Sequence, residues 1–380
     1  MTEQVNTPEL RFPEFTEKLI LQKLNSVASV TMGQSPKSSN YTDDFKQMTL
    51  VQGNADLKNG KINSRIYTTE ITKIAKVQDI ILTVRAPVGE LAIAQKEVCI
   101  GRGVCAIKAN KFVYYFLEKL KINKLWTRLS QGSTFEAISG NDIKNINVTL
   151  PSKKEQTKIG NFFSKLDQQI ELEEKKLELL EQQKKGYMQK IFSQELRFKD
   201  ENGNEYPEWE EKTIKDVYKV TRGYVLARKL MSDNPNSINK YPVYSSQTSN
   251  NGLMGYYSDY LYQDAITWTT DGANAGSVSF RHGKFYCTNV CGVLLNELGN
   301  SNVCMAEMLN NIAFKYVSKV GNPKLMNNVM AMIKLKFPCL EEQQAISKFL
   351  NVFSEVIDNQ NKKVELLKER KKGLLQKMFV

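Results

Sequence analysis

The sequence predicts an α+β protein in which two mixed α/β target-recognition domains are separated by two long helices that pair as an antiparallel coiled coil. Two observations predict this fold class. A 42-residue segment occurs twice at a constant offset of 187 residues, so the chain is a pseudo-twofold duplication. Both copies have a seven-residue apolar repeat typical of paired helices, whereas the segments before them mix strand-like runs with one helical stretch each. The predicted segments are 1–150, 151–193, 194–337 and 338–380.

The repeated segment begins at Pro151 and again at Pro338. Seventeen of the 42 aligned positions are identical, and both copies end in the pattern KKG-x-x-QK-x-F. Each copy lacks internal proline and is rich in Leu, Glu, Lys and Gln, which favours a continuous helix. The chain therefore alternates a variable segment with a repeated helix, twice.

Two apolar rows run along each helix, and each row is interrupted at one level. The polar interruptions are Glu173 and Lys184 in the first copy and Gln360 and Lys371 in the second. An antiparallel register that sets polar against polar predicts these opposed pairs: Glu173–Lys371, Lys184–Gln360, Ile170–Leu374, Leu177–Leu367, Leu180–Val364 and Tyr187–Ile357. A shift by one heptad would place polar residues against apolar ones, at a cost in free energy. The alternative is two separate amphipathic helices, each packed on its own domain.

The two variable segments combine strands, one helical stretch and polar loops. The predicted strands are 80–87, 91–94, 104–108, 265–270, 278–280 and 291–295, and the predicted helical stretches are 112–126 and 305–319. The loops between them contain glycine, serine and asparagine, as in MGQSPKSSN and TTDGANAG. The openings of the two halves also agree, because ELRF occurs at residues 9–12 and again at 195–198.

Composition limits the chemistry that this chain can carry. The 380 residues include 53 Lys and Arg, 41 Asp and Glu, and a single histidine, His282, with a formal net charge of +12. No apolar run approaches the roughly 18 residues of a membrane span, and the N-terminal residues lack a signal-peptide layout. We therefore expect a cytoplasmic protein with no membrane partner, reduced cysteines and no metal site. The positive charge, which is largest in residues 1–150, favours an acidic partner.

No active-site motif emerges. A phosphate-binding G-x-x-x-x-G-K-[ST] loop and the usual amino-methylation motifs are absent from the sequence. Glu173-Glu174-Lys175 resembles part of a nuclease motif, but it lies in the middle of a predicted helix. Asp271 precedes a glycine and is interpreted as a turn residue or part of a ligand-reading loop. We expect no catalytic residue; a nuclease or methyltransferase with degenerate motifs, and a coiled-coil interaction protein without DNA function, are the alternatives.

The loops supply the side-chain types that read nucleic acid. Dispersed positive charge suits phosphate contacts, and Arg, Lys, Asn, Gln and Ser present hydrogen bonds to base edges. Each residue alone is compatible with a solvated loop, so the prediction rests on the group. The candidate DNA-binding residues are Gln34, Ser35, Lys37, Asn40, Arg85, Gln131, Ser133, Thr134, Arg222, Tyr224, Arg228, Ser246, Gln247, Asn274 and Lys324.

The chain resembles the specificity subunits of type I restriction–modification enzymes. The resemblance covers the whole chain and rests on the two openings, on ITWTTDGANAG and on the repeated helices. The helix positions that carry it are Pro151, Glu155, Gln156, Ile159, Phe162 and 184–192, with Pro338, Glu342, Gln343, Ile346, Phe349 and 371–379 in the second copy. One departure from the shared pattern is Phe15, where the second half has Trp209.

The resemblance implies a non-catalytic subunit whose two recognition domains each read one half of an asymmetric, bipartite double-stranded DNA target. The helices would set the spacer and dock two modification (methyltransferase) subunits, and two restriction subunits would complete the assembly. The cofactors S-adenosylmethionine, ATP and Mg²⁺ are then expected on the partner subunits, and none on this chain. By match to the family, residues 34–36, 132–134 and 321–324 should lie near DNA. The alternative is the specificity subunit of a bifunctional, type IIB-like system that cuts and methylates.

Overall fold

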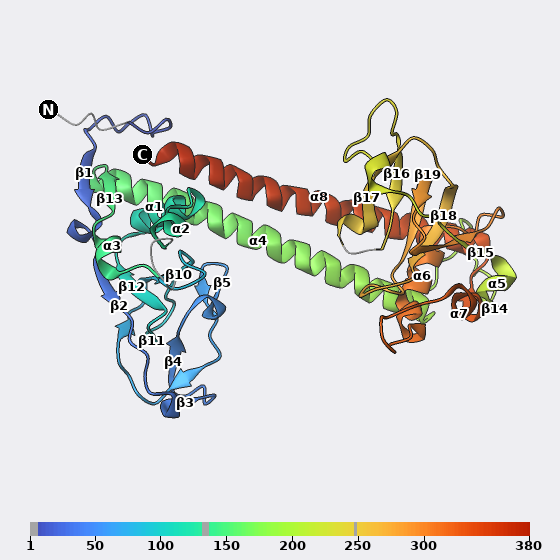
Figure 1. Cartoon of the computed structure of the whole chain (residues 1–380), viewed down its shortest axis with the longest axis horizontal. Coiled ribbons are helices and arrows are strands. Elements are labelled where there is room, and N and C mark those ends of the chain that lie inside the picture. Colours follow the sequence, from blue (N-terminus) through green and yellow to red (C-terminus); the bar gives the residue numbers. More distant parts are fainter. Residues whose placement is uncertain (1–6, 131–136, 247–248) are drawn as a thin grey trace. The chain divides into compact units, whose positions relative to one another are not determined.

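The computed structural model describes residues 7–130, 137–246 and 249–380, which form two compact units. Unit 1 contains Met1–Lys176 together with Asn361–Val380, and unit 2 contains Leu177–Gln360. The two long helices, α4 (Lys153–Phe192) and α8 (Leu340–Met378), contribute one part to each unit (Figure 1). Among the described residues, no helix combines the length and apolar character that crossing a bilayer requires.

Helices α4 and α8 pack together in an antiparallel pair, as the coiled-coil prediction requires. In unit 1 the start of α4 meets the end of α8, where the Phe163 and Phe379 ring centroids are 5.9 Å apart. In unit 2 the end of α4 meets the start of α8, where the Tyr187 and Phe353 centroids are 5.8 Å apart. The helices begin two residues after Pro151 and Pro338 and continue without interruption, because no proline or glycine cap stops them.

Two pairings predicted along the seam, Glu173–Lys371 and Lys184–Gln360, are wrong, and the apolar pairings stay predictions. Tyr187 contacts Phe349 and Phe353. Lys184 donates to Ser354 Oγ at 3.0 Å instead of facing Gln360. Within unit 1, Lys371 pairs with Asp167 at 2.7 Å and Glu173 pairs with Lys363 at 2.5 Å. The observed polar partners therefore lie six to eight residues from the predicted ones, and helices of the recognition domains contact the seam as well.

Unit 1 consists of three sheets and three short helices besides its parts of α4 and α8. Its strands are β1 (Ile20–Lys23), β2 (Ser29–Met32), β3 (Tyr41–Thr42), β4 (Met48–Val51), β5 (Leu57–Lys58), β6 (Lys61–Ile62), β7 (Tyr67–Thr68), β8 (Ile74–Ala75), β9 (Ile80–Thr83), β10 (Leu91–Ile93), β11 (Val98–Ile100), β12 (Val104–Lys108) and β13 (Asn147–Leu150). Its helices are α1 (Lys111–Ile122), α2 (Leu125–Ser130) and α3 (Gly140–Lys144). The central sheet has the order β2-β12-β9-β10-β6-β5, and β1 pairs with β13.

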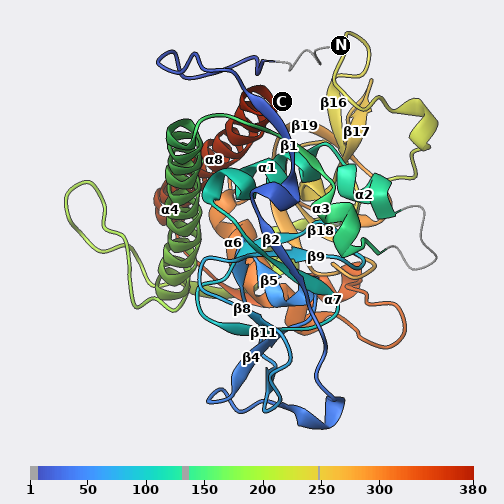
Figure 2. The same ribbon diagram turned by 90° about the vertical axis from the view of Figure 1, so that its left-hand side faces the viewer.

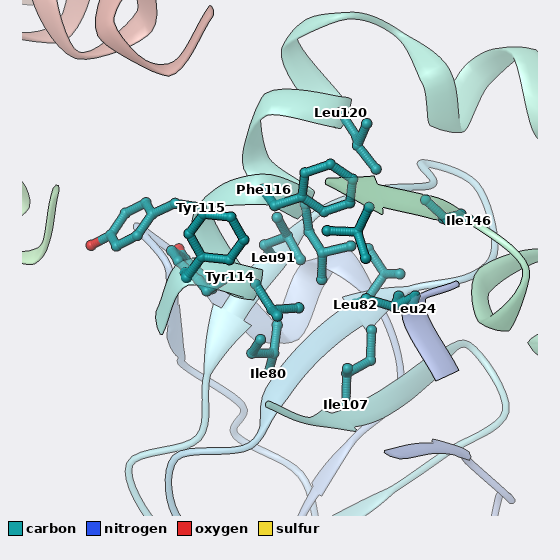
Figure 3. Packing of buried hydrophobic residues seen from close by; sticks show 14 of the residues in the cluster. Leu24, Ile80, Leu82, Leu91, Ile107, Tyr114, Tyr115, Phe116, Leu120 and Ile146 are labelled. Atoms are coloured by element: carbon teal, nitrogen blue, oxygen red, sulfur yellow. The ribbon is translucent and has the colours of Figure 1, made fainter. Parts of the chain in front are cut away.

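The core of unit 1 lies between its central sheet and α1. Phe116 and Leu120 of α1 point toward Leu82 of the sheet, whereas the Tyr115 side chain points away from that strand (Figure 3). Helices α4 and α8 add Phe163, Leu375 and Phe379 to the same cluster. Burial of this continuous apolar surface holds the helix ends on the domain.

The second face of the central sheet is covered by a five-stranded sheet of order β3-β7-β4-β11-β8. Val51, Val98 and Ile100 of this sheet pack against Ile81 and Ala92 of the central sheet. This outer sheet lies at the end of the unit remote from β1 (Figure 2). The sequence did not predict it, because strands of two to four residues show no usable alternation.

Unit 2 repeats the central sheet of unit 1. Its strands are β14 (Glu210–Thr213), β15 (Lys219–Arg222), β16 (Tyr241–Tyr244), β17 (Leu253–Tyr257), β18 (Tyr262–Thr269), β19 (Val278–Cys287), β20 (Cys291–Leu295) and β21 (Lys334–Phe337), and its helices are α5 (Ile214–Val217), α6 (Val303–Ala313) and α7 (Asn327–Met332). The order is β15-β20-β18-β19-β16-β17, and β14 pairs with β21. All five neighbouring pairs of this sheet match those of unit 1 in direction, and in both sheets the fourth pair is parallel.

The strands predicted at 80–87, 91–94, 104–108, 265–270, 278–280 and 291–295 correspond to β9, β10, β12, β18, β19 and β20. Each predicted helical stretch is shorter than expected. The first divides into α1 and α2 at Lys124, which has a positive φ of 57°, and the second ends in a 3-10 turn after α6.

Candidate nucleic-acid interface

The first candidate loop of unit 1 begins where β2 ends. The Gly33 amide donates to the Val104 carbonyl at 3.0 Å, and the Gln34 amide donates to the Ile100 carbonyl at 2.9 Å. A Cβ on Gly33 would lie 2.1 Å from the Gly101 carbonyl oxygen, so only glycine permits this approach. The exposed Gln34 therefore projects from a fixed base, and Ser35 Oγ accepts a hydrogen bond from the Arg102 amide at 3.1 Å.

A second loop of unit 1 leaves β9 beside the first one. The Val84 amide donates to the Gly103 carbonyl at 2.9 Å, and the exposed Arg85 that follows forms a β-bridge with Ala137. Gly103 and Val104 are consecutive, so one strand start, that of β12, holds both loops. The structure thereby brings the predicted residues Gln34, Ser35 and Arg85 to the same end of the central sheet.

Unit 2 presents the same pair of loops. The Gly223 amide donates to the Cys291 carbonyl at 3.0 Å, and the Thr270 amide donates to the Val290 carbonyl at 3.0 Å. A Cβ on Gly223 would lie 2.0 Å from the Cys287 carbonyl oxygen. The start of β20 therefore holds the loop after β15 and the loop after β18, as the start of β12 does in unit 1.

These matched loops carry different side chains. Tyr224 follows Gly223 and is 62% exposed, at the position that Gln34 occupies in unit 1. Asp271 occupies the position of Arg85 and bridges to Lys324, whose Nζ lies 3.6 Å from the Asp271 carboxylate. Asn274 lies three residues further along the same loop. Two surfaces with one backbone plan and unlike side chains suit two different ligand sequences.

The other predicted residues are held by a carboxylate, lie at or near the surface, or fall outside the described residues. Lys37 and Asn40 are engaged by Glu70, since the Lys37 amide and the Asn40 side-chain amide donate to its carboxylate at 2.8 and 2.7 Å. These hydrogen bonds hold the pKa of Glu70 below its usual value. Arg228 pairs with Asp233, away from the Gly223 turn. Arg222 is exposed and Ser246 is half-buried, while Gln131, Ser133, Thr134 and Gln247 lie outside the described residues.

Sequence reasoning missed the polar contacts that attach each domain to its helix. Arg11 forms a two-point ion pair with the buried Glu155, with the shorter distance 2.7 Å. Arg197 does the same with Glu342, which is fully buried and also accepts a hydrogen bond from Trp209 Nε1 at 2.8 Å. Phe15 has no donor for this purpose, so the departure at this position removes one hydrogen bond. The sequence signal for these contacts was that ELRF and the Glu-Gln pair at the helix start each occur twice.

The glutamine that follows each of these glutamates secures the domain's own helix. Gln156 accepts a hydrogen bond at 2.8 Å from Asn110, the residue that caps α1, and Gln343 accepts one at 2.7 Å from Asn302, which caps α6. The Nε2 group of each glutamine also donates at 2.9 Å to the carbonyl of the proline that precedes the helix. The Glu-Gln pair thus positions the recognition domain on the repeated helix in both units.

A lysine near the end of each repeated helix also reaches the recognition domain. In unit 1, Lys371 lies 2.7 Å from carboxylate oxygens of both Glu118 and Asp167, at the edge of a cleft of about 950 Å³. Burial raises the pKa of Glu118 despite the adjacent ammonium group. Burial alone would lower the pKa of Lys371, but the two carboxylates raise it overall. In unit 2, Lys184 reaches Ser354 and Glu307.

The described residues contain no group of three or more His, Cys, Asp or Glu side chains arranged to hold a metal ion. Cys287 and Cys291 are buried, and burial raises the pKa of the Cys291 thiol to about 12. A thiol of this kind is a core side chain and not a ready metal ligand.

Comparison with known proteins identifies the class to which this fold and these paired loops belong. A family model described as the type I restriction modification DNA specificity domain matches residues 21–182 and again residues 206–369. The chain therefore belongs to the family of type I restriction–modification specificity subunits, which recognise DNA sequence, and it carries the family's domain twice.

Similar proteins include the MpnII type I specificity subunit of Mycoplasma pneumoniae, with 36% identity over 151 residues, 38% of this chain and 44% of that protein. A predicted subunit of the same organism is 34% identical over 57% of this chain and 78% of its own length. A predicted MjaX subunit of Methanocaldococcus jannaschii is 36% identical over 45% of this chain, and the match spans only 41% of that relative.

The fold is also found in solved structures. A type I S subunit from M. genitalium matches 99% of both chains with a TM-score of 0.67 at 18% identity. A structure concerned with assembly and conformational transition of the type I system matches 96% of this chain and 98% of that one, with a TM-score of 0.56 at 16% identity. At these identities the likeness concerns the fold alone.

Proposed function

We propose that this chain is the non-catalytic specificity subunit of a type I restriction–modification complex and that each recognition domain reads one half of an asymmetric, bipartite DNA target. The observation that carries the proposal is the matched pair of loops held at the starts of β12 and β20. The two loop sets share their backbone hydrogen bonds but differ at Gln34 against Tyr224 and Arg85 against Asp271. One plan with two sets of side chains is what two unlike half-sites require.

The helices supply the spacing between the half-sites. A helix of 40 residues such as α4 is about 60 Å long at about 1.5 Å per residue. Half-sites on DNA one helical turn apart are separated by about 34 Å. A rigid element of this length is sufficient to separate two readers by a few unread base pairs.

The same helices offer docking faces for two modification subunits. Leu179 on α4 and Leu366 on α8 are 50% and 66% exposed, at equivalent positions of the two copies. Seven residues further along, Gly186 and Gly373 each leave open space where a Cβ would lie. A glycine inside a helix costs stability, and no contact among the described residues explains it. Two equivalent apolar faces suit two copies of one partner, the modification subunit. S-adenosylmethionine, ATP and Mg²⁺ would bind to the partner subunits, and the restriction subunits would complete the assembly.

The test is methylation by the reconstituted complex. We expect the purified chain alone to transfer no methyl groups, and the chain with its modification subunit to methylate one bipartite sequence. Methylation by the chain alone would contradict the proposal. A single partner chain that both cuts and methylates would identify the type IIB-like system instead.

A further inference from the structure

The second recognition domain contains a buried arginine that lacks a carboxylate partner. Arg281 lies on β19 and is 5% exposed. Its Nε donates to Thr267 Oγ1 at 3.1 Å, and its guanidinium carbon lies 3.9 Å from the centre of the Tyr244 ring. None of the ion pairs formed within the described residues includes Arg281. A buried positive charge without a paired negative charge is costly, so its retention calls for an explanation.

The guanidinium group still has free donors. Its hydrogen-bonding contacts to the described residues are those with Thr267 and Tyr244, so part of its five N–H donors stay unused. Neither Nη nitrogen is among the described side-chain atoms that are both sealed from solvent and unpartnered, which are Glu118 Oε2 and Ser301 Oγ. The stem and plane of the guanidinium are fixed by Thr267 and Tyr244. This is a preorganised donor pair of the kind that binds two acceptor oxygens or nitrogens at once.

The position of Arg281 connects it to the candidate interface. Tyr244, which covers the guanidinium, is paired with Cys287 between the parallel strands β16 and β19. The Cys287 carbonyl accepts the Tyr224 amide at 3.2 Å, at the turn that presents the exposed Tyr224. The residue after Cys287, Thr288, donates to Ser245 Oγ at 2.9 Å beside Ser246. Arg281 thus lies behind the loops that carry the predicted reading residues Tyr224 and Ser246.

We propose that Arg281 binds an acceptor pair of the DNA in the half-site read by the second domain, and that this contact supplies the negative partner that the free chain lacks. The proposal rests on the proposed function. The shared chemistry is a bidentate acceptor, which is offered both by the N7 and O6 atoms of guanine and by phosphate oxygens. Sequence reasoning overlooked this residue because it lies within a strand and not in a polar loop.

The experiment uses the full chain assembled with its modification subunit. The target sequence is first determined by mapping methylated positions in DNA exposed to the wild-type complex. Binding of that duplex, and of duplexes substituted at each position, is then measured for wild type, Arg281→Gln and Arg281→Lys. Lys215→Gln is the matched control, because this exposed lysine lies on α5, which precedes β15, whereas the Tyr224 turn follows β15.

The two sources of acceptor give different results, and both support the proposal. For a guanine contact, we expect Arg281→Gln to lose at least tenfold in affinity and to accept other bases at one position of one half-site only. For a phosphate contact, affinity should fall equally for all sequences, the salt dependence should weaken by about one ion, and Arg281→Lys should restore part of the affinity.

An arginine with only a structural role would contradict the inference. The decisive result is Arg281→Lys, which keeps the charge and the stem. The assignment would be overturned if Arg281→Lys kept wild-type affinity and base preference, and if any loss of affinity in Arg281→Gln only followed its loss of thermal stability. Absence of any sequence preference in the wild-type complex would instead reject the proposed function, so the two failures are distinguishable.

Discussion

Lys371 and Lys184 occupy equivalent positions of the two repeats, but the polar groups that they contact differ between the two units. In unit 1 the helix position facing the lysine is Asp167, which accepts a hydrogen bond from Tyr115 of α1 at 2.8 Å. In unit 2 that helix position is Ser354, and α6 supplies Glu307 at the place of Tyr115. Lys371 therefore meets two carboxylates, one on the repeated helix and one on α1, whereas Lys184 meets a hydroxyl group on the repeated helix and one carboxylate on α6.

Replacement of Lys371 tests this contact at the scale of a residue. Lys371→Met leaves Glu118 and Asp167 without their positive partner, so we expect unit 1 to lose about 2 kcal/mol of unfolding free energy, less than for a fully buried pair because both carboxylates keep some exposure. Urea unfolding would be followed by fluorescence in a background where Trp126 is the remaining tryptophan. The exposed Lys372→Met is the control, and equal unfolding midpoints for the two variants would refute the role of Lys371.

The thiols provide a second prediction at the residue scale. Of the six cysteines, five are buried, and Cys339 is half-buried. Burial raises the pKa of Cys105 and of Cys291 to about 12, so at pH 8 these groups are protonated and react slowly. We expect one thiol per chain to react rapidly with a disulfide reagent at pH 8, and all six after denaturation. The fast phase should vanish in Cys339→Ser; two or more fast thiols would contradict the packing described.

At the scale of elements, the helices were predictable and their detailed pairing was not. The repeat, the absence of proline and the two apolar rows are sufficient to define α4 and α8. The pairing logic considered only two helices, whereas α1 and α6 supply Glu118 and Glu307 to the seam lysines. The heptad pattern holds no information about such a third surface, and this is why the predicted partners of Lys184 and Lys371 were wrong.

The strands show the same limit. Buried apolar strands such as β9, β12 and β18 were predicted, because their burial leaves a continuous apolar run in the sequence. The close approach of Gly33 and Gly223 to a neighbouring strand end, which fixes the reading loops, emerged only from the structure. Arg281 was missed for a related reason: its partners Thr267 and Tyr244 are distant in the chain.

The glycines of the repeated helices test the proposed docking faces at the element scale. A Cβ at Gly186 or Gly373 would meet no atom within 4 Å in the part of the chain that the structure describes, so alanine should stabilise each helix by about 0.5–1 kcal/mol. If a partner helix packs closely there, the double variant should bind the modification subunit at least tenfold more weakly. Gln189→Ala, exposed on the same helix, is the control. Stabilisation without weaker binding would show that the partner does not use the glycines.

At the scale of the whole molecule, the duplication extends to the contacts between the start of each recognition domain and the end of one repeated helix. The Leu196 amide donates to the Lys190 carbonyl at the end of α4, and the Leu10 amide donates to the Lys377 carbonyl at the end of α8, both at 3.0 Å. Glu195 and Glu9 form ion pairs with the same two lysines. Each unit thus joins one recognition domain to the start of one helix and to the end of the other, which makes the domains separate modules on a shared scaffold.

Exchange of one module tests the central claim most directly. Residues 1–150 would be replaced by the corresponding segment of another specificity subunit, and the methylated sequence would be mapped with the same modification subunit. Because the second domain and both helices are retained, we expect one half-site to change while the other half-site and the spacer stay the same. A change in both half-sites, or in neither, would contradict the account of two independent readers.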